Sequence, residues 1–122
     1  MGHQRNTGID NAKGKYVAFI DADCIADKSW LKELVKAIEN SGENVAAVGG
    51  PNLVMESDND FAQLVGYAQE TFLGSGGSPA VSNSNKILYD VITVPNCNAI
   101  FKRNIITSVK YDDMIHIAED AD

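Results

Sequence analysis

Two carboxylates at the end of an apolar run are the first residues that could do chemistry. Asp21 and Asp23 are separated by one residue and directly follow the run Tyr16–Ile20. Their mutual repulsion and any loss of hydration are costly unless a cation offsets both. Carboxylate oxygens suit Mg²⁺ or Mn²⁺, which also bridge to substrate phosphates. Spacing alone leaves a second interpretation open, in which the strand simply leaves the sheet here and Asp23 or Asp27 caps the next helix.

A second acidic cluster lies nearly a hundred residues later, at Glu119, Asp120 and Asp122. If the two clusters face each other across one cleft, a carboxylate of the second could act as a general base beside the metal. Taken by itself, the second cluster favours a plainer interpretation as a solvated acidic stretch.

Composition excludes several function classes. The 122 residues contain 17 acidic and 10 basic residues, for a formal net charge of −7, which argues against a nucleic-acid partner. Cys24 and Cys97 lack the spacing of a zinc site. No apolar run approaches the roughly 20 residues that span a bilayer, and no signal-peptide pattern occurs. We expect a cytoplasmic chain with no membrane segment, and leave open whether its parent protein lies at the cytoplasmic face of a membrane.

Hydrophobic periodicity predicts the elements that position these groups. The β-branched and aromatic run Tyr16–Ile20 predicts a strand buried on both faces of a parallel sheet. Apolar residues at i, i+3, i+4 and i+7 from Leu31 to Ile38 predict an amphipathic helix that ends within 40–42. A second strand is expected over 45–55, with a bend or close backbone approach at 49–51. The other expected elements are one or two helical turns within 5–14, a helix over 61–72, a loop over 74–86, strands over 87–94 and 98–101, and a short helix over 104–109.

The order strand, helix, strand, helix, strand predicts an α/β layered domain with a mostly parallel or mixed sheet flanked by helices. In such sheets ligands bind beyond the carboxyl ends of the strands. Asp21 and Asp23 occupy that place.

Five motifs in order along almost the whole chain resemble those of family-2 glycosyltransferases of the GT-A (Rossmann-like) fold. They are Arg5-Asn6-x-Gly8-Ile9, the run from Ala12 to Cys24, Trp30-Leu31, the run from Pro95 to Arg103, and Tyr111-Asp112-Asp113 with Glu119-Asp120. The resemblance implies transfer of a sugar from a nucleoside-diphosphate sugar to a glycan, lipid or other hydroxyl acceptor.

The resemblance also implies roles for the residues of the donor site. Asp23 matches the metal ligand of the D-x-D motif, and Asp21 matches the aspartate that faces the ribose or a metal-bound water. Arg5 and Asn6 match the pair beside the donor nucleotide, where a guanidinium can contact phosphate or ribose oxygens. A surface salt bridge is the alternative interpretation of Arg5.

For the acceptor side, Asp120 matches the base that deprotonates the acceptor hydroxyl in inverting transfer, and Glu119 matches a neighbour that orients or binds the acceptor. Asn98 lies where the family lines the sugar and acceptor pocket, and its amide can both donate and accept. An asparagine that bonds local backbone at the start of a strand is the alternative for Asn98.

Comparison with the motif order of the family leads us to interpret residues 1–122 as a single truncated catalytic-domain fragment. The motifs begin at Arg5-Asn6 and end at Glu119-Asp120, so the nucleotide-base-binding strands and the segment after the E-D motif are expected to be missing. We therefore expect the isolated fragment to be inactive and to self-associate, as a homodimer, through the exposed sheet edge at 16–20. An inert fold fragment is one alternative. A D-x-D phosphatase of the haloacid-dehalogenase type is another, but its later lysine and G-D-x-x-D cluster are not found.

Overall fold

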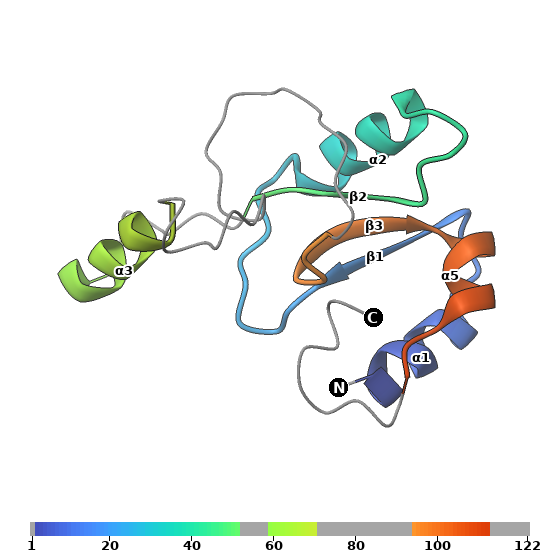
Figure 1. Cartoon of the computed structure of the whole chain (residues 1–122), viewed down its shortest axis with the longest axis horizontal. Helices are drawn as coiled ribbons and strands as arrows, with labels where there is room; N and C mark the ends of the chain where they lie inside the picture. The colour runs from blue at the N-terminus through green and yellow to red at the C-terminus, as the bar shows by residue number, and fades with distance from the viewer. Residues whose placement is uncertain (1, 52–58, 71–93, 113–122) are drawn as a thin grey trace.

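Four helices and three strands make up the part of the chain that the structure describes. This computed structural model describes residues 2–51, 59–70 and 94–112 (Figure 1). The elements are α1 (Gly2–Asn11), β1 (Tyr16–Ile20), α2 (Trp30–Asn40), β2 (Ala47–Gly49), α3 (Asp60–Glu70), β3 (Asn98–Lys102) and α5 (Arg103–Val109).

The three strands form one sheet in the order β1-β3-β2, and β3 is antiparallel to both neighbours. Ile20 lies opposite Asn98, and Gly49 lies opposite Ala99. The strands β1 and β2 run in the same direction, but β3 separates them. The prediction of a mostly parallel sheet is therefore wrong for these pairings. A continuous apolar run indicates only that helices cover both faces of a strand, and a covered antiparallel strand meets that condition as well as a parallel one.

Helices cover both faces of the sheet, which confirms the layered α/β prediction. On one face Val17 packs in a cluster with Ile9 of α1 and Ile106 of α5. On the other face Ile100 of β3 packs with Leu34 and Ile38 of α2. Figure 1 shows α2 on one side of the sheet and α1 with α5 on the other.

The helix α2 is confirmed where the apolar spacing predicts it. In the turn before it, Asp27 accepts hydrogen bonds from the Ser29 hydroxyl at 2.6 Å and the Ser29 N–H at 2.8 Å. These bonds hold the pKa of the Asp27 carboxyl below its usual value. At the other end Asn40 and Ser41 donate to carbonyls of the last turn, those of Lys36 and Ile38.

The predicted break in the second strand is also confirmed. The strand β2 ends at Gly49, where an added Cβ would lie 3.0 Å from the Cβ of Val94 and 3.1 Å from the Asn98 carbonyl oxygen. Contacts this short are tighter than most Cβ atoms make, so a side chain at position 49 would push Val94 and the Asn98 carbonyl away. Residues 52–55 of the expected second strand, the expected loop over 74–86 and residues 87–93 of the expected strand over 87–94 lie outside the described residues.

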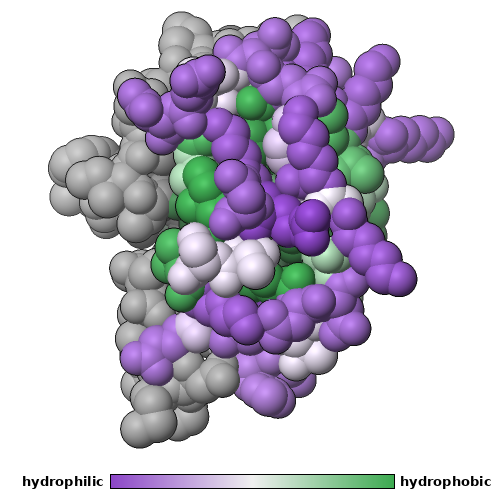
Figure 2. Space-filling model, turned by 90° about the vertical axis from the view of Figure 1, so that its right-hand side faces the viewer, coloured by the Kyte–Doolittle hydropathy of each residue, from purple (hydrophilic) through white to green (hydrophobic). Residues whose placement is uncertain are grey.

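The surface at the end of the sheet near α1 and α5 is mainly hydrophilic. Figure 2 views the molecule from the right-hand side of Figure 1 and shows polar side chains over most of this face, with apolar side chains visible between them. Within the three described ranges, no helix has the length and apolar character needed to cross a membrane.

Self-association through β1 stays a prediction. The strand order indicates which edge of β1 could pair with a second chain. Within the described ranges β1 pairs with β3 alone, so its other edge has no strand partner there. Such an edge is a template for pairing with a second chain. We expect light scattering coupled to size-exclusion chromatography to show a dimer whose fraction grows with protein concentration. A monomer at every concentration would contradict this expectation.

Candidate functional site

The site begins where β1 ends. Ile20 is the last residue of the strand, and the next four residues form a turn in which the Cys24 N–H donates to the Asp21 carbonyl at 3.1 Å. This turn puts Asp21 and Asp23 just beyond the carboxyl end of β1. The Asp21 side chain is 42% exposed, and Asp23 is exposed as well. Both carboxylates can therefore reach a ligand from solvent.

The helix α1 brings a cation to the first of these carboxylates. Arg5 Nη2 lies 3.4 Å from Asp21 Oδ1, and the Arg5 side chain is only 11% exposed. The guanidinium also lies over the ring of Tyr111, 5.7 Å from its centroid. An ion pair this shielded is worth more than an exposed one, because solvent screens it less. The surface salt bridge considered for Arg5 is thus a partly buried contact, shielded on the Arg5 side and open to solvent on the Asp21 side.

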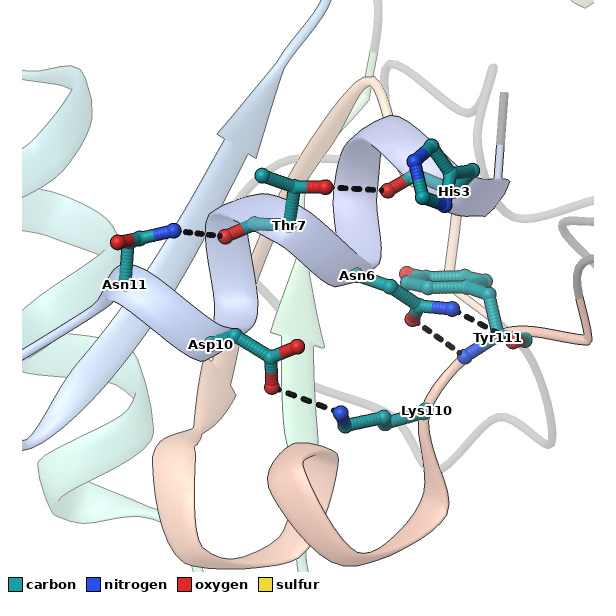
Figure 3. A network of polar contacts seen from close by, with 7 residues as sticks. All are labelled: His3, Asn6, Thr7, Asp10, Asn11, Lys110 and Tyr111. Carbon is teal, nitrogen blue, oxygen red and sulfur yellow. Dashed lines mark hydrogen bonds and ion pairs between the residues drawn. The ribbon is translucent and has the colours of Figure 1, made fainter.

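Asn6 is the other residue expected to bind the donor nucleotide. Its side-chain amide forms hydrogen bonds with the main chain of Tyr111. Its Nδ2 donates to the Tyr111 carbonyl at 2.8 Å, and its Oδ1 accepts from the Tyr111 N–H at 2.9 Å. Figure 3 shows this reciprocal pair, with the ion pair between Lys110 and Asp10 beside it. These bonds link α1 to the chain just after α5.

Asn98 joins three segments near the same end of the sheet. Its Oδ1 accepts from the Trp30 indole N–H at 2.8 Å, and its Nδ2 donates to the Pro51 carbonyl at 2.9 Å. The Gly50 N–H donates to the Asn98 carbonyl, and an added Cβ on Gly50 would lie 2.9 Å from Asn98 Nδ2. Asn98 thus fixes the start of α2 and the chain after β2, which adds a positioning task to its expected contact with sugar.

Tyr111 and Asn96 both lie in motifs of the family resemblance, which implies that Asn96 lines the sugar and acceptor pocket, but the contact between the two residues was not predicted. The Tyr111 hydroxyl donates to Asn96 Oδ1 at 2.6 Å, and Asn96 is 3% exposed. The only available signal was chemical: a tyrosine that packs in a protein interior needs a partner for its hydroxyl.

The two cysteines lie near the carboxylates. Slight desolvation raises the pKa of the exposed Cys24 thiol, and the charges of Asp23, Cys97 and Asp21 raise it further. A raised pKa keeps this thiol protonated and weakly nucleophilic.

The donor set of the turn fits a hard divalent cation that also binds substrate. Among the described residues, no group of three or more His, Cys, Asp or Glu side chains could hold a metal by itself. Mg²⁺ and similar ions are commonly held by one or two carboxylates, with waters and substrate phosphates completing the shell. Asp21 and Asp23 provide such a pair. The expected base Asp120 and its neighbour Glu119 lie outside the described residues.

Comparisons with known proteins point to one family. The glycosyl transferase family 2 profile matches residues 1–109. Glycosyltransferase AglE of Haloferax volcanii is 46% identical over 46 residues, which cover 38% of this chain and 14% of that protein. The pre-mycofactocin glycosyltransferase of Mycobacterium tuberculosis is 26% identical over 121 residues, covering 97% of this chain and 24% of that protein.

A third relative, the succinoglycan biosynthesis protein ExoO of Rhizobium meliloti, is 25% identical over 128 residues, covering 98% of this chain and 34% of that protein. The chain therefore spans about a third or less of the length of these relatives. No solved structure matches it significantly.

Proposed function

The chain belongs to glycosyl transferase family 2, and from this premise we propose that its protein carries out metal-dependent, inverting transfer of a sugar on a GT-A fold. The donor in this proposal is a nucleoside-diphosphate sugar, and the acceptor is a hydroxyl of a glycan, a lipid or another molecule. Sugar transfer in general is the activity of the family. The metal, the inversion and the residue roles are our proposal.

The observation that carries the proposal is the pairing of Arg5 with Asp21 at the carboxyl end of β1. It puts a guanidinium and two carboxylates at one edge of the sheet, in the place where α/β sheets bind ligands. A diphosphate carries negative charge, which this acidic chain can bind only with local positive charge. Arg5 supplies one such charge, and a metal at Asp21 and Asp23 supplies the other.

The residues of the proposed site divide into a metal site, a donor nucleotide site and a sugar and acceptor site, and Asp21 belongs to the first two. Asp23 and Asp21 would hold Mg²⁺ or Mn²⁺, and the bound ion would supply positive charge to offset that of the departing diphosphate. Arg5, Asn6 and Asp21 form the donor nucleotide site. Asn98 and Glu119 orient the sugar and the acceptor.

The chemical step is a single displacement. The acceptor oxygen forms a bond to the anomeric carbon while the bond from that carbon to the diphosphate oxygen breaks. Asp120 takes the proton of the acceptor hydroxyl, and the nucleoside diphosphate leaves with the bonding electrons. Because attack comes from the face opposite the leaving group, the anomeric configuration inverts.

A transfer assay tests this proposal. Purified full-length protein would be offered a panel of nucleoside-diphosphate sugars with Mn²⁺ or Mg²⁺, with and without a chelator, and the anomer of the product determined by NMR. We expect transfer that the chelator stops, with an inverted anomer. Hydrolysis of phosphate esters without transfer would instead favour the D-x-D phosphatase. Failure to bind any donor would favour an inert fold.

The metal site predicts a loss of donor binding in Asp23→Asn. This change removes a charged ligand and keeps the size of the side chain. We expect calorimetry to show nucleoside-diphosphate binding in the presence of Mn²⁺ weakened at least about 100-fold, since changes to residues that only support a metal ligand already cost roughly 10- to 100-fold.

Asp27→Asn is the matched control for this variant. It removes the same charge from the same loop at an exposed side chain whose partner is Ser29. Donor affinity should stay within about twofold of the unmodified protein. Equal binding by the Asp23 and Asp27 variants would remove Asp23 from the metal site.

A further inference from the structure

Tyr111 is held in place from three directions. The Asn6 amide bonds both its N–H and its carbonyl, at 2.9 and 2.8 Å, and its hydroxyl donates to Asn96 Oδ1 at 2.6 Å. Phe19 of β1 packs against its ring edge-on, with the centroids 6.1 Å apart. Asn6 and Asn96 are themselves buried. Tyr111 therefore has little freedom to move, although it lies outside any helix or strand.

The backbone of Lys110, the residue before Tyr111, is strained. Lys110 has φ 57° and ψ 170°, a combination that residues with a side chain rarely adopt. Such strain persists only where surrounding contacts hold it. Two contacts do so here: the 2.7 Å ion pair between Lys110 and Asp10, and the reciprocal bonds of Asn6 to Tyr111 (Figure 3).

The face of the fixed ring is turned to Arg5. The guanidinium carbon lies 5.7 Å from the ring centroid, within the range of a cation–π contact. The same guanidinium reaches Asp21 at 3.4 Å. Arginine has several rotatable bonds, and ordering them on binding a ligand carries an entropic cost. A ring that already holds the guanidinium beside Asp21 removes part of that cost.

We propose that Tyr111 is a positioning residue of the donor site, whose ring holds the Arg5 guanidinium against Asp21 and whose place is fixed by Asn6 and Asn96. The inference rests on the proposed function, because it needs Arg5 and Asp21 to be donor residues. It assigns Asn6 the task of holding Tyr111, in addition to any contact with the donor. A residue that only packs would stabilise the fold without influencing donor affinity.

Two substitutions separate the ring from the hydroxyl. Tyr111→Phe removes the bond to Asn96 and keeps the ring, whereas Tyr111→Leu removes both. We expect calorimetry of nucleoside diphosphate with Mn²⁺ to show a smaller loss of affinity for Tyr111→Phe than for Tyr111→Leu, because Asn6 and Phe19 still hold the ring when the bond to Asn96 is gone. For Tyr111→Leu we expect affinity about tenfold weaker, in the range that a partly desolvated cation–π contact supplies. The loss should disappear in an Arg5→Met background, since the two side chains act through one contact.

A third variant preserves the shape of the ring and so protects the test against failure of Tyr111→Leu to fold. A trifluorinated phenylalanine at position 111 weakens the negative face of the ring while retaining its packing. Donor affinity should then fall relative to Tyr111→Phe, with an unchanged melting temperature. Equal affinity in these two proteins would overturn the inference.

A readout without donor distinguishes this failure from failure of the proposed function. In the NMR spectrum the Arg5 side-chain protons should carry a ring-current shift in the unmodified protein and in Tyr111→Phe, and lose it in Tyr111→Leu. If the unmodified protein binds no nucleoside diphosphate, the proposed function fails, and the Arg5 shift alone decides whether Tyr111 positions Arg5. If it binds and Tyr111→Leu binds equally well, only the present inference fails.

Discussion

Replacing Asp120 by asparagine is expected to slow sugar transfer by about 100- to 10,000-fold, the range that a positioned general base contributes. Asparagine has almost the same shape as aspartate but cannot accept the proton of the acceptor hydroxyl. The turnover number at saturating donor and acceptor measures the loss. Donor affinity, measured by calorimetry with Mn²⁺, should stay unchanged because the donor site uses other residues.

Asp122→Asn is the control for this variant. Asp122 belongs to the same acidic cluster two residues further along the chain, so the substitution makes an equal change in charge. Its turnover number should remain within about twofold of the unmodified protein. If Asp120→Asn keeps its activity, Asp120 is not the base. If both variants lose activity together, the cluster acts through its summed charge.

Replacing Ile100 by alanine is expected to lower the free energy of unfolding by about 2–5 kcal/mol, the usual cost of this truncation in a core. Ile100 is 1% exposed, lies on the central strand β3 and packs against Leu34 and Ile38 of α2. The cavity would open at the contact between the sheet and its helix. Urea unfolding followed by circular dichroism gives the change.

Ile25→Ala removes the same atoms from a side chain that is 76% exposed. Its free energy of unfolding should change by no more than roughly 0.5 kcal/mol. A loss below about 1 kcal/mol in Ile100→Ala would mean that the packing of α2 on β3 contributes little to stability. Since small domains are stable by only about 5–15 kcal/mol, the expected loss is a large share of the total.

The sequence predicts burial in part, because the spacing of apolar residues identifies one face of a helix. On that face of α2, Leu34 and Ile38 are buried, whereas Leu31 is 51% exposed. The apolar residues Phe61 and Leu64 of α3 are exposed as well. The near-continuous apolar run of β1 contributes to clusters on both faces of the sheet, Val17 on one and Ala18 on the other. Strand order and direction have no such signature. Nothing in the residues of β1 or β2 indicates that β3 lies between them.

The partners of polar side chains were harder to predict for a related reason. Trp30 lies in one motif of the family resemblance and Asn98 is an expected sugar contact, yet their mutual hydrogen bond joins positions 68 residues apart. The bonds between Asn6 and Tyr111 span 105 residues. Contacts over such separations depend on the tertiary fold, whereas sequence patterns report the neighbourhood along the chain. The sequence therefore indicates which types of polar side chain take part in hydrogen bonds, but not which two residues form each bond.

The central position of β3 has a consequence for the order in which the domain can fold. Tyr16 pairs with Lys102 and Ala47 pairs with Phe101. Both pairings of the described sheet therefore need β3, which is synthesised last of the three strands. Closing such long loops has an entropic cost that must be met before the contacts form. A chain emerging from the ribosome therefore holds β1 and β2 without their partner until residues 98–102 appear. Both pairings of the described sheet can therefore form only late in synthesis, and until then the apolar run of β1 is a segment at which the chain can aggregate.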